Sequence, residues 1–131
     1  MANIGAFGAQ AQLDWVLGGA SPTRPASRLV ALSYGTPSSV SGSEHSSNLG
    51  YARQSVLFGP AASPAGSASN TAAMTFGPFS SSNAIQGLLI YDTISIFSGN
   101  IWWYGTLLTA RTVLPGDTLV VAAGALIATL S

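Results

Sequence analysis

The sequence predicts an all-β protein: a jelly-roll-like β-sandwich of about seven or eight strands, preceded by one short helix. Strand-length apolar runs recur between turn signals, at intervals typical of sandwiches and barrels. A helical spacing of apolar residues occurs only near the N-terminus, and strands do not alternate with helices as they would in a parallel α/β sheet. The chain has 131 residues, and this length fits a single domain spanning residues 1–131.

The helix is predicted over residues 6–17, in the stretch AFGAQAQLDWVLGG. Phe7, Ala11 and Trp15 recur every four residues and therefore share one stripe, which Leu13, Val16 and Leu17 widen. Gly18 and Gly19 are typical helix terminators. Because so short a helix is marginal on its own, we expect packing to stabilise it.

The strands follow, separated by loops rich in Ser, Gly and Pro at 36–48 and 59–70. They are expected at 28–34, 51–58, 71–76, 84–92, 95–97, 101–109 and on both sides of Gly124 within 118–130. The strand at 84–92 is apolar enough to be buried on both faces.

A turn is predicted at LPGDT, residues 114–118. Pro115 presets the backbone for the second turn position, and Gly116 accepts the positive φ of the third position in a type II turn. Asp117 can close the turn by accepting a hydrogen bond from a nearby backbone N–H.

The run TLVVAAGALIATL, residues 118–130, carries no charge. As a helix it would reach only about 20 Å, short of the ~30 Å hydrocarbon core of a membrane. Two buried strands around Gly124 explain the run better, so we expect no membrane contact.

Charge is scarce: 6% of the residues are Asp, Glu, Lys or Arg, and the net charge is zero. Typical domains have about 25% charged residues. The chain has no Lys, and its four Arg are scattered, whereas nucleic-acid binding requires clustered basic residues. We therefore expect no nucleic-acid partner. Cysteine is also absent, which removes disulfides and thiolate metal sites.

Candidate chemistry is equally sparse, and we expect no catalytic residue, no cofactor and no metal site. His45, the one histidine, lies beside Glu44 in a Ser-rich loop and reads as a solvated side chain. No nucleophile-elbow pattern is present. The other acids, Asp14, Asp92 and Asp117, are spread along the chain and do not form a metal-ligand cluster.

The stretch NIWWYGTLL, residues 100–108, places two tryptophans and a tyrosine side by side. In a regular strand Trp102 and Tyr104 face one way, and Ile101 and Trp103 the other. A large aromatic therefore lies on each face. Trp103 is either half-buried under a loop or under the helix that carries Trp15, or it is covered by another subunit. An exposed aromatic face that binds sugar is a third interpretation.

Arg53, close to Tyr51 in GYARQSV, has two interpretations. Its stem covers apolar surface while its head reaches water, or its guanidinium forms an ion pair or hydrogen-bond fork at an interface. Aromatic residues and Arg are enriched at interface centres. The candidate interface residues are Trp102, Trp103, Tyr104, Arg53 and Tyr51.

The order of several motifs resembles a family of small bacteriophage virion proteins often labelled "tail fiber protein". The motifs are LDWVLGG (13–19), LVALSYGTPS (29–38), GYARQSVLF (50–58), NTAAMTFGP (70–78), IWWYGTL (101–107) and GDTLVVAAGALIATL (116–130). The chain departs from the pattern in its Ser-rich loop at 41–48 and its very apolar last strands. Small β-rich proteins of this kind also resemble capsid decoration, or cement, proteins, which sit as trimers on icosahedral heads.

The resemblance implies a virion protein and leaves two functions. The first is a homotrimeric decoration protein that binds the major capsid protein on the head exterior and stabilises the shell. The second is a tail fibre or baseplate component that recognises a host surface glycan or receptor. A fibre usually has an elongated shaft with repeats, and this sequence has no internal repeat. The first function is therefore favoured.

Overall fold

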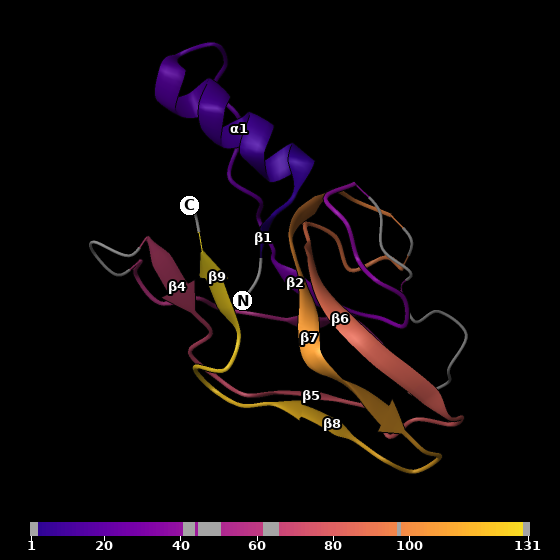
Figure 1. Ribbon diagram of the computed structural model, residues 1–131. Coiled ribbons are helices and arrows are strands. Elements are labelled where there is room, and N and C mark those ends of the chain that lie inside the picture. The colour runs from indigo at the N-terminus through magenta and orange to yellow at the C-terminus, as the bar shows by residue number, and fades with distance from the viewer. Residues whose placement is uncertain (1–2, 41–43, 45–50, 62–65, 97, 130–131) are drawn as a thin grey trace.

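A computed structural model describes the chain except residues 1–2, 41–43, 45–50, 62–65, 97 and 130–131 (Figure 1). Nine strands and one helix occur in the described part: β1 (Asn3–Ile4), α1 (Ala6–Leu17), β2 (Leu29–Ser33), β3 (Gln54–Ser55), β4 (Ser67–Ser69), β5 (Met74–Phe76), β6 (Asn83–Tyr91), β7 (Ile101–Val113), β8 (Leu119–Val121) and β9 (Ile127–Thr129). The predicted all-β class with one N-terminal helix is confirmed.

The strands form one large sheet and two small ones. The large sheet has the order β1-β7-β6-β2-β3, while β4 pairs with β9 and β5 with β8. Every pairing is antiparallel. The arrangement agrees with a β-sandwich, and the jelly-roll topology stays a prediction.

The main core lies between the large sheet and the β5–β8 pair. Val30 and Leu32 of β2 and Ile90 of β6 cluster with Met74 and Phe76 of β5. Phe76 and Phe79 are almost fully buried, and burial of one such side chain stabilises the fold by about 1.5–3 kcal/mol. This layer explains why apolar residues alternate along β5.

The opposite face of the large sheet is also covered, by a smaller cluster. Ala31, Leu89, Tyr91 and Ile101 are buried there, with Tyr104 packed against them. Strand β6 contributes to both clusters, and its predicted burial on both faces is confirmed for Leu89, Ile90 and Tyr91, whereas buried residues alternate along its first part.

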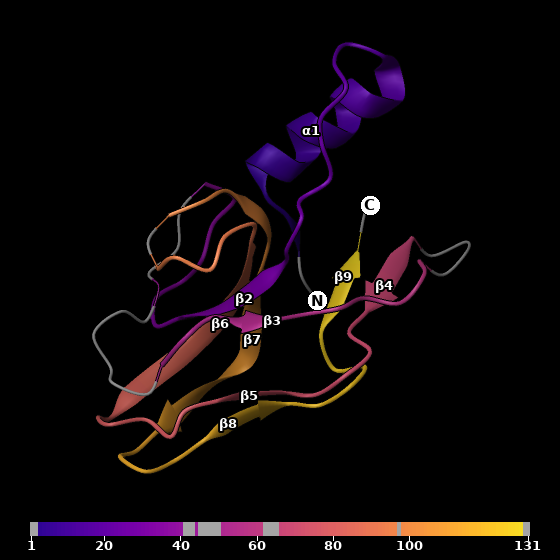
Figure 2. The ribbon, with the colours of Figure 1, turned by 180° about the vertical axis from the view of Figure 1, so that it is seen from behind.

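Helix α1 begins and ends where the sequence predicted, with Gly18 in the left-handed conformation (φ 77°) as its C-cap. Its apolar stripe is mostly exposed: among its residues only Gly8 and Ala11 are buried, and Trp15 is 71% exposed. The reason is visible in Figures 1 and 2, where α1 starts beside the large sheet and its other end projects away from the sheets.

Some strand predictions need correction. The predicted strand 51–58 shrinks to β3, and the predicted loop 59–70 contains β4. Residues 95–96 form a bend and turn rather than an edge strand, and Phe97 lies outside the described residues. Pairing with β9 makes a strand of β4, and strand formation in general depends on such context more than on local β propensity.

The C-terminal predictions hold in outline. Gly116 has φ 88°, and the Asp117 carboxylate accepts a hydrogen bond from the Leu114 N–H at 3.0 Å, as the turn required. Strands β8 and β9 lie on either side of Gly124. They are not fully buried, however, because Val120 and Ile127 are exposed. In the described part, no helix is both long and apolar enough to cross a membrane.

Candidate functional site

A β-bulge sets the geometry of the aromatic strand. Trp103 pairs with Ile90, but Ile101 pairs with Tyr91, so Trp102 is an extra residue between two ladder positions. A bulge of this kind interrupts the alternation of side chains and re-aims the ones beside it.

The predicted sides of this strand are therefore wrong. Ile101 shares the smaller cluster with Tyr104, whereas Trp103 packs against the main core. Trp102 and Trp103 line the same groove instead of facing opposite ways. The extra residue shifts the register by one, and a one-residue shift reverses every side chain beyond it.

The start of α1 is anchored on Trp102. The Trp102 backbone carbonyl accepts a hydrogen bond from the Gly5 N–H at 2.7 Å. A side chain at Gly8 would lie 2.8 Å from that same carbonyl oxygen, so glycine is needed for this close approach. The ring of Phe7 meets the Trp102 ring edge-on, with centroids 5.1 Å apart. Helix α1 therefore covers Trp102.

The other edge of Trp102 is held by Asp92. The indole N–H donates to the Asp92 carboxylate at 3.3 Å, and Asn100 donates to it from both its backbone and its side chain. Partial burial by itself raises the pKa of Asp92, but these hydrogen bonds outweigh it and lower the pKa below its ordinary value. The carboxylate thus stays ionised and fixes the indole.

A groove of about 440 Å³ opens beside the two tryptophans. Its floor is formed by Ile90, Trp102 and Trp103 of the large sheet. The other lining residues come from α1, the segment after it, and the β4–β9 region: Gln12, Arg24, Pro25, Arg28, Phe58, Ala61, Gly66, Ala68 and Ala128. Most of these side chains are apolar, so the groove suits apolar groups.

A second hollow of about 360 Å³ lies between α1 and the segment that follows it. It shares Gln12, Arg24, Pro25 and Trp102 with the groove. The charged residues that line either hollow are Arg24 and Arg28, and no acid lines them among the described residues. The site is therefore mostly apolar, and its charged lining residues, Arg24 and Arg28, are positive.

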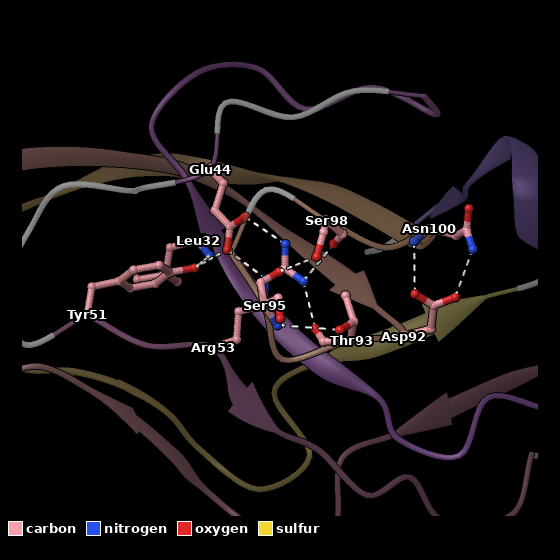
Figure 3. Close-up of polar contacts among 9 residues, drawn as sticks. All are labelled: Leu32, Glu44, Tyr51, Arg53, Asp92, Thr93, Ser95, Ser98 and Asn100. Carbon is pink, nitrogen blue, oxygen red and sulfur yellow. Dashed lines mark hydrogen bonds and ion pairs between the residues drawn. The ribbon is translucent and has the colours of Figure 1, made fainter.

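The other two candidate interface residues belong to a buried polar network (Figure 3). The Arg53 guanidinium donates to both carboxylate oxygens of Glu44 at 2.7 Å, and both side chains are almost completely buried. It also donates to the carbonyls of Thr93 and Ser98 and lies 3.8 Å from the centroid of the Tyr91 ring. Neither sequence interpretation placed this guanidinium in the chain's own interior.

Tyr51 completes the network. Its hydroxyl donates to Glu44 at 2.9 Å and accepts from the Leu32 N–H at 3.2 Å. Burial strongly raises the pKa of Tyr51, and the hydrogen bond from the Leu32 N–H only partly opposes it. Tyr51 and Arg53 are thus occupied inside one chain, and the described surface presents Trp102, Trp103 and Tyr104 only as half-buried side chains.

Sequence reasoning missed Glu44, which it placed in a solvated loop. The carboxylate is 1% exposed because it neutralises Arg53. The scarcity of charge is the available signal, since a buried Arg in such a chain requires one of very few acids. His45, its neighbour, lies outside the described residues.

Three of the four acids have structural roles within the described residues. Glu44 pairs with Arg53, Asp92 fixes Asn100 and Trp102, and Asp117 closes a turn. The described part of the chain holds no group of three His, Cys, Asp or Glu side chains placed to bind a metal.

Fold and site define a small all-β protein whose most distinctive surface is an apolar aromatic groove. The family model described as "Podophage GP4 fiber I protein gp80" matches residues 3–129. The chain belongs to this family. It is therefore a small phage virion protein of the kind labelled as a tail fiber protein, as the resemblance predicted. No curated protein matches the chain.

Proposed function

We propose that this chain is a structural subunit of a podophage tail fibre and acts through protein–protein contacts. The observation that carries the proposal is the match to a fiber I protein family over residues 3–129. The match favours the fibre over the decoration role that sequence reasoning had preferred. The fibre's outward partner would be a host surface glycan or receptor.

The aromatic groove is the surface through which the subunit assembles. Trp102 and Trp103 lie on it side by side, and apolar side chains form most of its wall. Interfaces are richest in aromatic residues and Arg at their centres, where other charges are depleted. We expect the subunits to form a homotrimer, the oligomer predicted from the sequence.

The proposed role requires no catalysis. Glu44, Asp92 and Asp117 each have a structural partner, and Arg53 is neutralised by Glu44. An enzyme of the glycosidase type would need two carboxylates facing each other across a substrate. Asp92 instead accepts hydrogen bonds from Asn100 and Trp102.

A second candidate is a decoration protein on the head exterior, with the major capsid protein as its partner. The absence of an internal repeat from the sequence favours it, because fibre shafts are usually repetitive. A ligand that binds only the assembled lattice stabilises it by mass action.

Phage particles assembled without this chain separate the two candidates. For a fibre subunit, the particles adsorb poorly to host cells but release DNA at the same temperature as wild-type particles. For a decoration protein, the heads release DNA at a lower temperature and adsorption is unchanged. The second result would overturn the fibre proposal.

A further inference from the structure

We infer that the groove beside Trp102 and Trp103 is filled by α1 of a second copy of this chain. The part that enters is the helix face formed by Leu13, Val16 and Leu17. This inference rests on the homo-oligomer in the proposed function and specifies its contact. It does not depend on where the protein sits in the virion.

The first observation is the helix face itself. Leu13, Val16 and Leu17 are spaced i, i+3, i+4 and therefore lie side by side on one face. They are 60%, 68% and 77% exposed. The buried Gly8 and Ala11, which face the chain's own body, lie on the other side of the helix. An exposed contiguous apolar face of this kind marks an interaction surface.

The helix also needs a partner for its own stability. It has 12 residues and no side-chain N-cap hydrogen bond. Isolated helices shorter than about 12–15 residues are marginal in water, so tertiary or quaternary packing must stabilise them. Within the chain, Phe7 and Gly8 in the first half of α1 contact β7, whereas its later half faces the segment that follows it across the second hollow.

The second observation is the groove's chemistry. The amide and charged side chains that line this groove are those of Gln12 and two arginines. Its floor is formed by Ile90, Trp102 and Trp103. Such a surface matches the helix-in-groove mode of recognition, in which apolar anchors at i, i+3 and i+4 enter a hydrophobic groove.

The third observation is charge complementarity. The only charged residue of α1 is Asp14, which is three residues before Leu17 and therefore borders the same face. Among the described residues Asp14 takes part in no ion pair. Arg24 and Arg28 line the groove, and no described acid neutralises them there. Asp14 of one copy can thus pair with these arginines of the next.

The helix face cannot reach the groove of its own chain. From α1 only Gln12 lines the groove, and the helix end projects away from the body in both views (Figures 1 and 2). The contact therefore joins two different surfaces on two copies. A heterologous contact of this type closes into a ring when its rotation permits, and a ring of three agrees with the expected homotrimer.

The test is mixing of two complementary variants in sedimentation velocity. The helix variant carries Leu13→Gln, Val16→Gln and Leu17→Gln, with Gln chosen because it is a good helix former. The groove variant carries Ala68→Trp, which fills the groove from β4. The control is Leu108→Gln, since Leu108 is fully exposed on β7 and does not line the groove.

We expect wild-type protein and the Leu108→Gln control to form the same oligomer at micromolar concentration. Each test variant alone should associate at least about tenfold more weakly. Mixed, they should form a one-to-one dimer, because one supplies an intact groove and the other an intact helix. A helix variant that assembles like wild type would overturn the contact and leave the homo-oligomer standing. A monomeric wild-type protein would overturn both, and would leave the groove to a different virion protein.

A charge exchange keeps the inference testable if the triple variant fails to fold. Asp14→Arg should weaken association at least about tenfold, and adding Arg24→Asp with Arg28→Asp in the same chain should restore it. Equal association of wild type and the Asp14→Arg variant would overturn the inference.

Discussion

Arg53 shows how one buried charge organises its surroundings. Its guanidinium reaches Glu44, the carbonyls of Thr93 and Ser98, and the face of Tyr91. It therefore fastens the segment after β6 to the residues before β3. Such bidentate, fully hydrogen-bonded pairs are the geometry in which a buried ion pair can offset its desolvation cost.

Breaking this pair should be costly. Arg53→Met leaves the Glu44 carboxylate buried without its cation, and we expect a loss of about 3–5 kcal/mol in the free energy of unfolding. Glu44→Leu combined with Arg53→Met should recover part of this loss, because no uncompensated charge remains. Urea unfolding followed by tryptophan fluorescence measures both.

Arg111→Met is the matched control, since Arg111 lies exposed on β7. Exposed charges contribute about 0–1 kcal/mol. An Arg53→Met variant as stable as the Arg111→Met variant would show that the buried pair does not hold the fold.

Deprotonation of the Tyr51 hydroxyl should make the free energy of unfolding depend on pH in the alkaline range. Its pKa is raised in the folded state, so its contribution is fully present below the unfolded value of about 10 and is lost as the pH rises above it. We expect the free energy of unfolding to fall between about pH 10 and pH 11. Urea titrations at several pH values measure this slope.

Tyr51→Phe should reduce the slope without abolishing it, because burial also raises the pKa of Tyr91. The variant is less stable at neutral pH as well, since the Leu32 N–H and the Glu44 carboxylate each lose a hydrogen-bond partner. An unchanged slope would contradict the buried hydroxyl.

Contacts between residues close in the sequence could be predicted, and contacts made through the tertiary fold could not. Asp117 and Gly116 were predicted because a turn is specified by adjacent residues. The Glu44–Arg53 pair was missed because it joins residues through the tertiary fold. The shared face of Ile101 and Tyr104 was missed because no local residue type indicates the bulge at Trp102.

At the scale of elements, α1 is defined by two different contacts. Its start lies so close to β7 that Gly8 faces the carbonyl of Trp102, and its later half projects outward. The predicted limits of the helix were right because apolar spacing and the terminal glycines are local signals. The direction of its apolar face could not be predicted, because both a core and a partner subunit produce the same pattern.

Gly8→Ala should therefore shift α1 away from β7. The added Cβ would lie 2.8 Å from the Trp102 carbonyl oxygen, a distance that requires the backbone to move. Alanine is intrinsically the better helix former by about 1 kcal/mol, so any loss of stability must come from this contact. We expect a lower unfolding midpoint and a changed near-ultraviolet signal from the Phe7–Trp102 pair.

The control for this variant is Gln10→Ala, at an exposed position of the same helix. It should leave both the midpoint and the spectrum near wild type. A Gly8→Ala variant more stable than wild type would contradict the close approach of α1 to β7.

At the scale of the whole molecule, the chain combines few charged residues with several exposed apolar side chains. Once Glu44 and Arg53 have paired, three charged residues of each sign remain. The acids are Asp14, Asp92 and Asp117, and the bases are Arg24, Arg28 and Arg111. The exposed apolar residues of α1 and the groove at Trp102 and Trp103 are complementary surfaces of the same chain. We therefore expect neighbouring subunits to stabilise this chain in an assembly.

The all-β class, the helix and the family were predictable because they rest on patterns spread over the chain. The choice between a fibre and a head coat was not, since a small β-sandwich with an apolar surface serves either. Fold and function are separate inferences here.

The most direct measurement is the location of the chain in the intact particle. A gold-labelled tag on this chain, viewed by electron microscopy of whole virions, should mark the tail fibres and leave the head surface bare. Label distributed over the head exterior would contradict the fibre assignment and establish the decoration role in its place.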